Sequence, residues 1–179
     1  MRAQVRQVAV LFARVDSVYK KLPGCDVFDI DRDARTWQGG VPAVAHPPCR
    51  AWGRLKTFAK PRADEKALGL FAFEQVRKFG GVLEHPAYSE LFKACGCATP
   101  GKKDEFGGYI LPIMQSWFGH RAPKSTWIYV MGCSAGNLPV MPMHLGMAAG
   151  RVENMGRRER EATPEPLARW LCEVARLCA

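Results

Sequence analysis

Short apolar runs alternate along the chain with longer stretches in which apolar residues recur at helical spacing. The first of them, residues 8–13, contains no polar residue, which is typical of a strand buried on both faces of a sheet. Residues 25–30, which include two aspartates, and the apolar residues 41–45 and 81–83 predict three further strands. Between the last two, residues 64–79 carry acids in the first turn and Gly80 at the end, and they predict a helix. Strand, helix and strand in this order predict a right-handed βαβ unit.

The rest of the pattern predicts more helices, one further strand and irregular connections. We expect a short helix capped by Asp16 or Ser17, helices at residues 88–94, 109–118 and 164–177, a strand at 125–131, a polar loop at 96–108, an irregular segment at 133–150 and a charged link at 156–161. The expected fold is α/β, a compact Rossmann-like three-layer sandwich with a mostly parallel sheet. Because no repeat or strong boundary divides the pattern, we expect one domain over residues 1–179.

Composition is ordinary for a globular protein, with 47% hydrophobic and 24% charged residues among 179. No apolar run approaches the ~20 residues that a membrane helix needs. The N-terminus also lacks the apolar segment of a secretory signal. We therefore expect a cytoplasmic protein without a membrane partner.

The formal net charge of +9 favours a polyanionic partner such as nucleic acid. A basic segment follows Cys49, with two aromatic residues interleaved. It contains Arg50, Trp52, Arg54, Lys56, Phe58, Lys60 and Arg62. Such a segment suits contacts with phosphates and bases, and the alternative is a solvated loop.

Seven cysteines, an odd number in a chain without a secretory signal, argue against a disulfide framework. Cys95 and Cys97 are separated by one residue, which is tighter than the usual zinc spacing, and no matching pair follows them. We expect no metal site, and we interpret the cysteines other than Cys49 as buried or incidental thiols.

Cys49 and Glu84 each follow one of the neighbouring predicted strands. Cys49 closes the sequence His-Pro-Pro-Cys after residues 41–45, and Glu84 opens Glu-His-Pro after residues 81–83. The carboxyl ends of neighbouring parallel strands meet at one sheet edge, where open α/β sheets bind ligands. A thiolate that adds to an electron-poor ring and an acid that polarises the ring would suit this placement. The alternatives are a structural cysteine and a glutamate that caps a helix or forms a salt bridge.

The order of these motifs resembles the DNA (cytosine-5)-methyltransferases, and small phage-encoded proteins of this type in particular. In that family a Pro-Pro-Cys loop carries the nucleophile and a Glu-Asn-Val motif carries the acid; here Pro47-Pro48-Cys49 matches the loop, and Glu84 matches the acid. A basic segment before a late strand is loosely matched by residues 120–124, and Arg160-Glu161-Ala162-Thr163-Pro164-Glu165 is similar to a run near the family's end. A phage origin would place the protein in the bacterial host cytoplasm.

The resemblance implies a DNA-modifying enzyme that acts on carbon 5 of a cytosine. The Cys49 thiolate would add at carbon 6, and a protonated Glu84 would stabilise the charge that develops at ring nitrogen 3. This mechanism needs a raised pKa at Glu84 and a lowered pKa at Cys49. The base would be flipped out of the duplex or taken from a single strand. We expect substrate contacts from Pro48, Arg50, Arg54, Arg121 and Lys124.

The resemblance also implies S-adenosylmethionine as the methyl donor, bound by Phe12, Asp29 and Asp31. The family's glycine-rich turn after the first strand is replaced here by Phe12-Ala13-Arg14-Val15, without a glycine. We therefore keep three alternatives. The donor could be another one-carbon carrier such as a methylene-folate, the substrate could be a free nucleotide, or the chain could be a non-catalytic DNA-binding protein. The chain is reduced relative to a full methyltransferase and has no target-recognition domain, so sequence specificity would need a protein partner.

Overall fold

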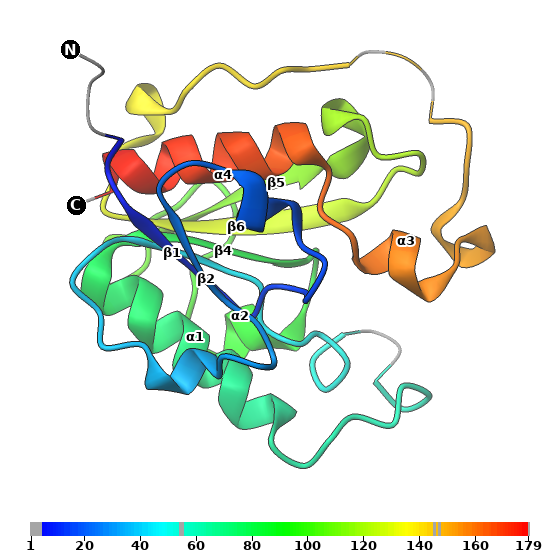
Figure 1. Cartoon of the computed structure of the whole chain (residues 1–179), viewed down its shortest axis with the longest axis horizontal. Coiled ribbons are helices and arrows are strands. Elements are labelled where there is room, and N and C mark those ends of the chain that lie inside the picture. The colour runs from blue at the N-terminus through cyan, green and yellow to red at the C-terminus, as the bar shows by residue number, and fades with distance from the viewer. Residues whose placement is uncertain (1–4, 54–55, 145, 147, 179) are drawn as a thin grey trace.

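A six-stranded mixed sheet forms the centre of the computed structural model, which describes residues 5–53, 56–144, 146 and 148–178 (Figure 1). The strand order is β2-β1-β3-β4-β6-β5. The strands are β1 (Val8–Leu11), β2 (Cys25–Phe28), β3 (Ala43–Ala45), β4 (Gly81–Pro86), β5 (Tyr109–Met114) and β6 (Ser125–Met131). The pairings among β2, β1, β3 and β4 are parallel, whereas β6 is antiparallel to both β4 and β5.

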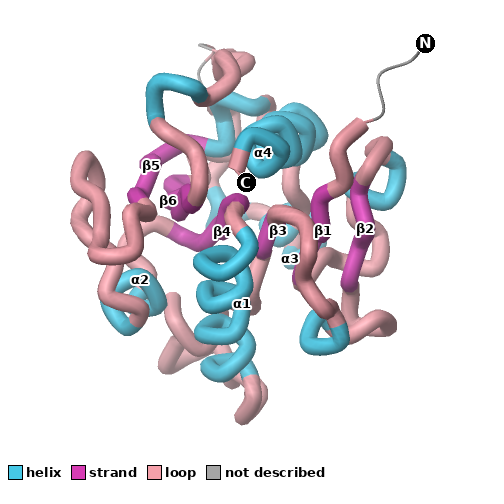
Figure 2. The backbone as a smooth tube through the Cα atoms, turned by 90° about the vertical axis from the view of Figure 1, so that its left-hand side faces the viewer, coloured by secondary structure: helices cyan, strands magenta, loops and turns pink. Residues whose placement is uncertain are grey.

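Helices cover both faces of the sheet, with α4 on one side and α1 and α2 on the other (Figure 2). The α-helices are α1 (Glu65–Phe79), α2 (Glu90–Ala94), α3 (Arg157–Glu161) and α4 (Glu165–Leu177). Successive strand residues point to opposite faces. Val8 and Val10 therefore pack in the core under α4, while Ala9 and Leu11 pack against the α1 side.

The predicted βαβ unit is confirmed as β3, α1 and β4, which are parallel neighbours in the sheet. Gly81 begins β4 with φ 118°, and a Cβ atom there would lie 2.0 Å from the backbone oxygen of Ala43. Only glycine allows this close approach. The strand continues to Pro86, three residues beyond the predicted end, so Glu84 lies within the strand rather than after it.

The predicted helix at residues 109–118 is wrong. Tyr109–Met114 forms β5, and Gln115–Phe118 forms a single 3-10 turn. Residues 109–114 pair along their whole length with β6 and cover its free edge. Pro112 lies inside this segment and disfavours a helix interior, but it is tolerated in an edge strand.

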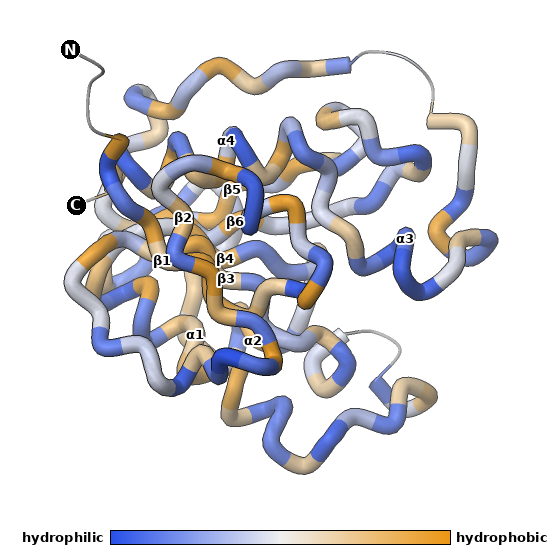
Figure 3. Tube along the Cα trace, in the orientation of Figure 1, coloured by the Kyte–Doolittle hydropathy of each residue, from blue (hydrophilic) through white to orange (hydrophobic). Residues whose placement is uncertain are grey.

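Other predicted elements agree in place and differ in detail. A 3-10 helix at Val18–Lys21 begins after Ser17, whose side chain accepts a hydrogen bond from the Tyr19 amide. The described residues of the segment 133–150 are irregular apart from the 3-10 turn Ala135–Asn137. The charged link at 156–161 contains the short helix α3, which is mostly hydrophilic in Figure 3. Among the described residues no helix is long and apolar enough to cross a membrane.

Candidate active site

The candidate residues gather at one edge of the sheet because β1, β3 and β4 all run toward it. His46 follows β3, Glu84 lies near the end of β4, and Gln115 follows β5, which runs in the same direction as β4. Lys124 precedes β6, which starts at this edge because it is antiparallel to β4. The topology thus brings together side chains from four strand ends.

Glu84 is the centre of a hydrogen-bonded network at this edge. One carboxylate oxygen, Oε2, lies 3.0 Å from His46 Nδ1, and the other, Oε1, accepts a hydrogen bond of 3.0 Å from Gln115 Nε2. The other ring nitrogen of His46 lies 2.9 Å from the Tyr19 hydroxyl. Gln115 also donates to the Thr126 hydroxyl, at 3.1 Å. Both oxygens of Glu84 are therefore fixed in direction by side chains from other elements.

The pKa of Glu84 is lowered to about 2. Burial favours the neutral carboxyl and would raise this pKa, but the hydrogen bond from His46 and the positive charge of Lys124 lower it. Where the rings of His46 and His85 are protonated, their charges act in the same direction, and together these effects outweigh burial. The expected raised pKa is thus wrong, because the sequence does not show that two stabilising partners face the carboxylate. In the resting protein Glu84 is ionised at neutral pH.

Cys49 lies on an exposed turn next to this network. Its carbonyl accepts hydrogen bonds from the Trp52 and Gly53 amides, at 3.1 and 2.8 Å. The turn is anchored through the Trp52 carbonyl, which accepts bonds from the Glu90 amide and the Ser89 hydroxyl at the start of α2. The backbone that carries the thiol is therefore held in place from both sides.

The pKa of the Cys49 thiol is raised, where activation as a resting thiolate needs a lowered pKa. Desolvation by the surrounding protein is the main cause, and the negative charge of Glu84 adds to it, while Lys124 acts in the opposite direction. Glu84 and Lys124 therefore lie close enough to the thiol to shift its pKa. Cys49 is a neutral thiol at neutral pH.

The residues predicted to contact the substrate differ in whether their side chains already have partners within the protein. Arg50 pairs with the fully buried Glu65 of α1. Arg121 pairs with Glu159 of α3 at 2.7 Å. The Lys124 ammonium donates to the Arg160 carbonyl, also in α3, at 2.9 Å.

Two further predicted contacts complete this set. Pro48 is half-buried beside Cys49. Arg54 lies outside the described residues. Pro48 thus adjoins the thiol, and Lys124 lies close enough to lower the pKa of the thiol. Arg50, Arg121 and Lys124 all have protein partners of their own.

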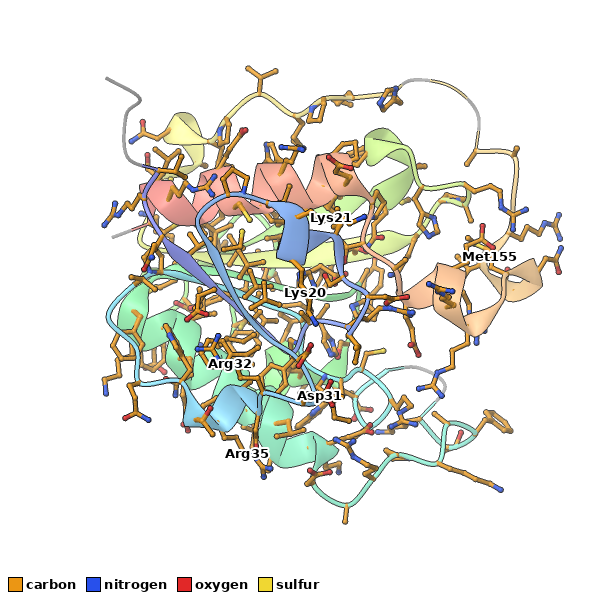
Figure 4. The ribbon with its side chains drawn as sticks, in the orientation of Figure 1. Lys20, Lys21, Asp31, Arg32, Arg35 and Met155 are labelled. Atoms are coloured by element: carbon orange, nitrogen blue, oxygen red, sulfur yellow. The ribbon has the colours of Figure 1, made fainter. Side chains whose placement is uncertain are left out.

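The predicted cofactor contacts lie near the ends of β1 and β2. Phe12 leaves β1 with φ 62°, a conformation that glycine adopts more readily, and its ring packs edge-on against Phe71 of α1, with ring centroids 6.3 Å apart. Asp29 is buried and accepts hydrogen bonds from Lys20 and from two loop amides. Asp31 is exposed at the exit of β2 (Figure 4).

A pocket of about 670 Å³ opens between these strand exits and α3. Arg14, Val15 and Ile30 line one side, and Arg158 and Glu161 of α3 line the other. The Arg14 guanidinium donates to Asp16 at 2.9 Å and to Glu161 at 3.4 Å. The lining carries three arginines, Arg14, Arg157 and Arg158, against two acids, Asp16 and Glu161. This excess of positive charge does not fit a cationic sulfonium cofactor bound in the manner that the resemblance implies.

Sequence patterns did not identify Tyr19, Gln115 or Thr126 as members of the site. Gln115 was hidden by the wrong helix at 109–118, and Tyr19 lies 27 residues before its partner His46. His46 directly precedes the Pro-Pro-Cys motif in the sequence. Within the described part of the chain, no group of three or more His, Cys, Asp or Glu residues could hold a metal ion.

Both thiol and carboxylate are thus present at one sheet edge, in the protonation states opposite to those expected. Comparisons of the chain with family models, with curated proteins and with solved structures give no match. The site geometry therefore carries the functional argument.

Proposed function

We propose that this protein modifies a pyrimidine, with cytosine in DNA as the substrate, through a covalent adduct between Cys49 and carbon 6 of the ring. The observation that carries this proposal is the largely buried, ionised Glu84, which is oriented by His46 and Gln115 at the same sheet edge as Cys49 and lies close enough to shift the pKa of the thiol. The fold would then be a reduced, Rossmann-like three-layer sandwich with its ligand at the carboxyl edge of the parallel strands.

The resting protonation states contain the proton that the reaction needs. A neutral thiol with an ionised carboxylate holds the same number of protons as a thiolate with a protonated carboxyl. As sulfur bonds to carbon 6, the thiol proton passes to Glu84 and from there to ring nitrogen 3, which receives the displaced electron pair. Carbon 5 becomes an enamine carbon that can take a one-carbon group from a donor.

DNA as the partner is supported by the net charge of +9 and by the basic segment after Cys49. The resemblance and the neighbouring pocket point to different one-carbon donors. S-adenosylmethionine is the donor that the resemblance implies, but Arg14 in the neighbouring pocket disfavours its positive charge. An anionic donor such as a methylene-folate is compatible with the same arginine. We derive no step through either donor.

The adduct is tested with a DNA oligonucleotide that contains 5-azacytosine. The nitrogen at position 5 of this base makes carbon 6 more electrophilic, and addition of the thiol places its proton on the ring without any donor. We expect a covalent complex with the wild type, seen on a denaturing gel and by intact mass. Glu84→Gln should slow its formation by about 100-fold, a typical effect of removing a general acid or base.

Cys49→Ser should abolish the complex, and Cys133→Ser is the matched control because Cys133 is a half-buried thiol beyond the far end of β6. DNA binding without any adduct, unchanged in Cys49→Ser, would overturn the proposal and leave a non-catalytic DNA-binding protein. An adduct with the free 5-azacytosine nucleotide and none with the oligonucleotide would move the substrate from DNA to nucleotides.

A further inference from the structure

Tyr19, His46 and Glu84 form a buried row of hydrogen bonds that links three separate segments of the chain. The Tyr19 hydroxyl is almost fully buried, and His46 Nε2 is its hydrogen-bond partner among the described residues. On the other side of the ring, His46 Nδ1 bonds to Glu84 Oε2. Each group in the row can be assigned as a donor or an acceptor from its chemistry.

The assignment follows from the single proton of Tyr19. A tyrosine in this buried position stays protonated, since burial raises its pKa well above the ordinary value. If His46 carried two protons, its Nε2–H would point at the hydroxyl oxygen, and the buried Tyr19 proton would have no acceptor among the described residues. The row is satisfied throughout when Tyr19 donates to Nε2 and Nδ1–H donates to Glu84.

We propose that His46, locked by Tyr19 as the neutral tautomer with its proton on Nδ1, is a positioning residue that holds Glu84 ionised and directed toward Cys49. This inference rests on the proposed function. In the proposed reaction, the role of His46 is to keep the Glu84 carboxylate free to accept the thiol proton. His46 does not itself contact the reacting ring.

Other groups also face this pair and set the background of its titration. The positive charge of Lys124 favours the ionised carboxylate, and Gln115 donates to its second oxygen. His85, on the other face of the sheet, adds to this effect only where it is protonated, below about pH 4, and the Cys49 thiol lies within electrostatic range of the carboxylate. These groups remain when His46 is replaced. A change in pH behaviour on replacement of His46 therefore reports the histidine.

Two replacements of His46 separate its two hydrogen bonds. His46→Asn places an amide nitrogen near the position of Nδ1 and keeps a donor for Glu84. His46→Gln reaches the position of Nε2, keeps the contact with Tyr19 and loses the donor for Glu84. Both variants are uncharged and of similar size, so each is a control for the other.

Adduct formation with the 5-azacytosine oligonucleotide is measured against pH. The wild type and His46→Asn should give flat profiles from about pH 5 to 8, since the carboxylate is ionised throughout. In His46→Gln the pKa of Glu84 should rise, so the rate should fall on the acid side and drop about tenfold or more at its lowest. Identical profiles for the two variants would overturn the proposal.

The tautomer is measured without any substrate, by the nitrogen chemical shifts of His46 in the labelled wild-type protein. We expect a protonated Nδ1 and an unprotonated Nε2, with mixed tautomers in Tyr19→Phe. The opposite tautomer, or a doubly protonated ring at neutral pH, would overturn the inference whether or not an adduct forms. Absence of any adduct in the wild type, with the expected tautomer, would overturn the proposed function alone.

Discussion

Glu84 and His85 are neighbours on β4 that point to opposite faces of the sheet. Glu84 lies in the hydrogen-bonded network, whereas His85 is buried on the α1 side against Phe92, with ring centroids 6.1 Å apart. Neither ring nitrogen of His85 has a hydrogen-bond partner among the described residues. Burial lowers the pKa of His85 from 6.5 to about 4, although the charge of Glu84 and the Pro48 carbonyl oppose this shift.

The lowered pKa values of His85 and Glu84 both make the folded state less stable in acid. The unfolded chain binds a proton at His85 below pH 6.5, while the folded protein binds it only below about 4, so this contribution to stability is present above pH 6.5 and is lost as the pH falls toward 4. The contribution of Glu84 is present above its ordinary pKa of 4.5 and is lost as the pH falls toward 2. The two residues act in successive pH windows.

We predict that His85→Leu removes the loss of stability that occurs between pH 6.5 and 4. The free energy of unfolding of the wild type should fall by ~3 kcal/mol between pH 6.5 and 4, since a tenfold difference in proton affinity is worth about 1.4 kcal/mol. The variant should lose much less over this range and keep its stability at pH 7, because leucine has no unpaired nitrogen to bury. Urea unfolding at a series of pH values measures the free energy of unfolding of the wild type and of the variant. An equal fall in the two proteins would contradict the prediction.

At the scale of elements, one buried ion pair joins α1 to the loop at 96–108 and to β6. Arg77 donates to Asp104 at 3.0 Å and to the Cys95 carbonyl at 2.7 Å. The Tyr129 hydroxyl donates to the same oxygen of Asp104, at 2.9 Å. Two loop amides, of Phe106 and Gly108, complete the coordination of the second oxygen. The carboxylate, only 1% exposed, thus ties a loop without regular structure to two packed elements.

We predict that Asp104→Ala lowers the free energy of unfolding by about 3 kcal/mol, the lower end for breaking a buried ion pair, because it leaves the half-buried Arg77 charge without its carboxylate partner. Asp104→Asn should be less damaging, since its amide oxygen can still accept part of the hydrogen bonds. Arg169→Ala, which breaks an exposed i, i+4 pair on α4, is the control and should cost less than about 0.5 kcal/mol. Similar losses for Asp104→Ala and Arg169→Ala in urea unfolding would contradict this account.

At the scale of the molecule, α3 spans the candidate site through exposed ion pairs. Glu161 pairs with Arg14, Arg158 with Asp16 at 2.8 Å, and Glu159 with Arg121. None of the residues of α3 is buried. Met155, two residues before the helix and labelled in Figure 4, is buried. Exposed ion pairs contribute little stability and are screened by salt. The position of α3 therefore depends on ionic strength more than the rest of the fold does.

We predict that raising the salt concentration from about 0.05 to 0.5 M increases hydrogen exchange at residues 157–161 and leaves α4 and β4 unchanged, because only α3 is held mainly by screened charges. Glu159→Gln combined with Glu161→Gln should show the high-salt behaviour already at low salt. Exchange in α3 that is independent of salt in the wild type would contradict the prediction.

The sequence by itself determined the parts that depend on local patterns. Short, mostly apolar segments predicted β1 to β4 and β6, helical spacing predicted α1 and α4, and the order of motifs placed Cys49 and Glu84 near adjacent strand ends. Only the tertiary structure decided that residues 109–114 form a strand, because their partner is β6. It also decided the protonation states of Glu84 and Cys49. A pKa depends on which charges and hydrogen bonds face a group, and Tyr19, His46, Gln115 and Lys124 reach this site from distant parts of the chain.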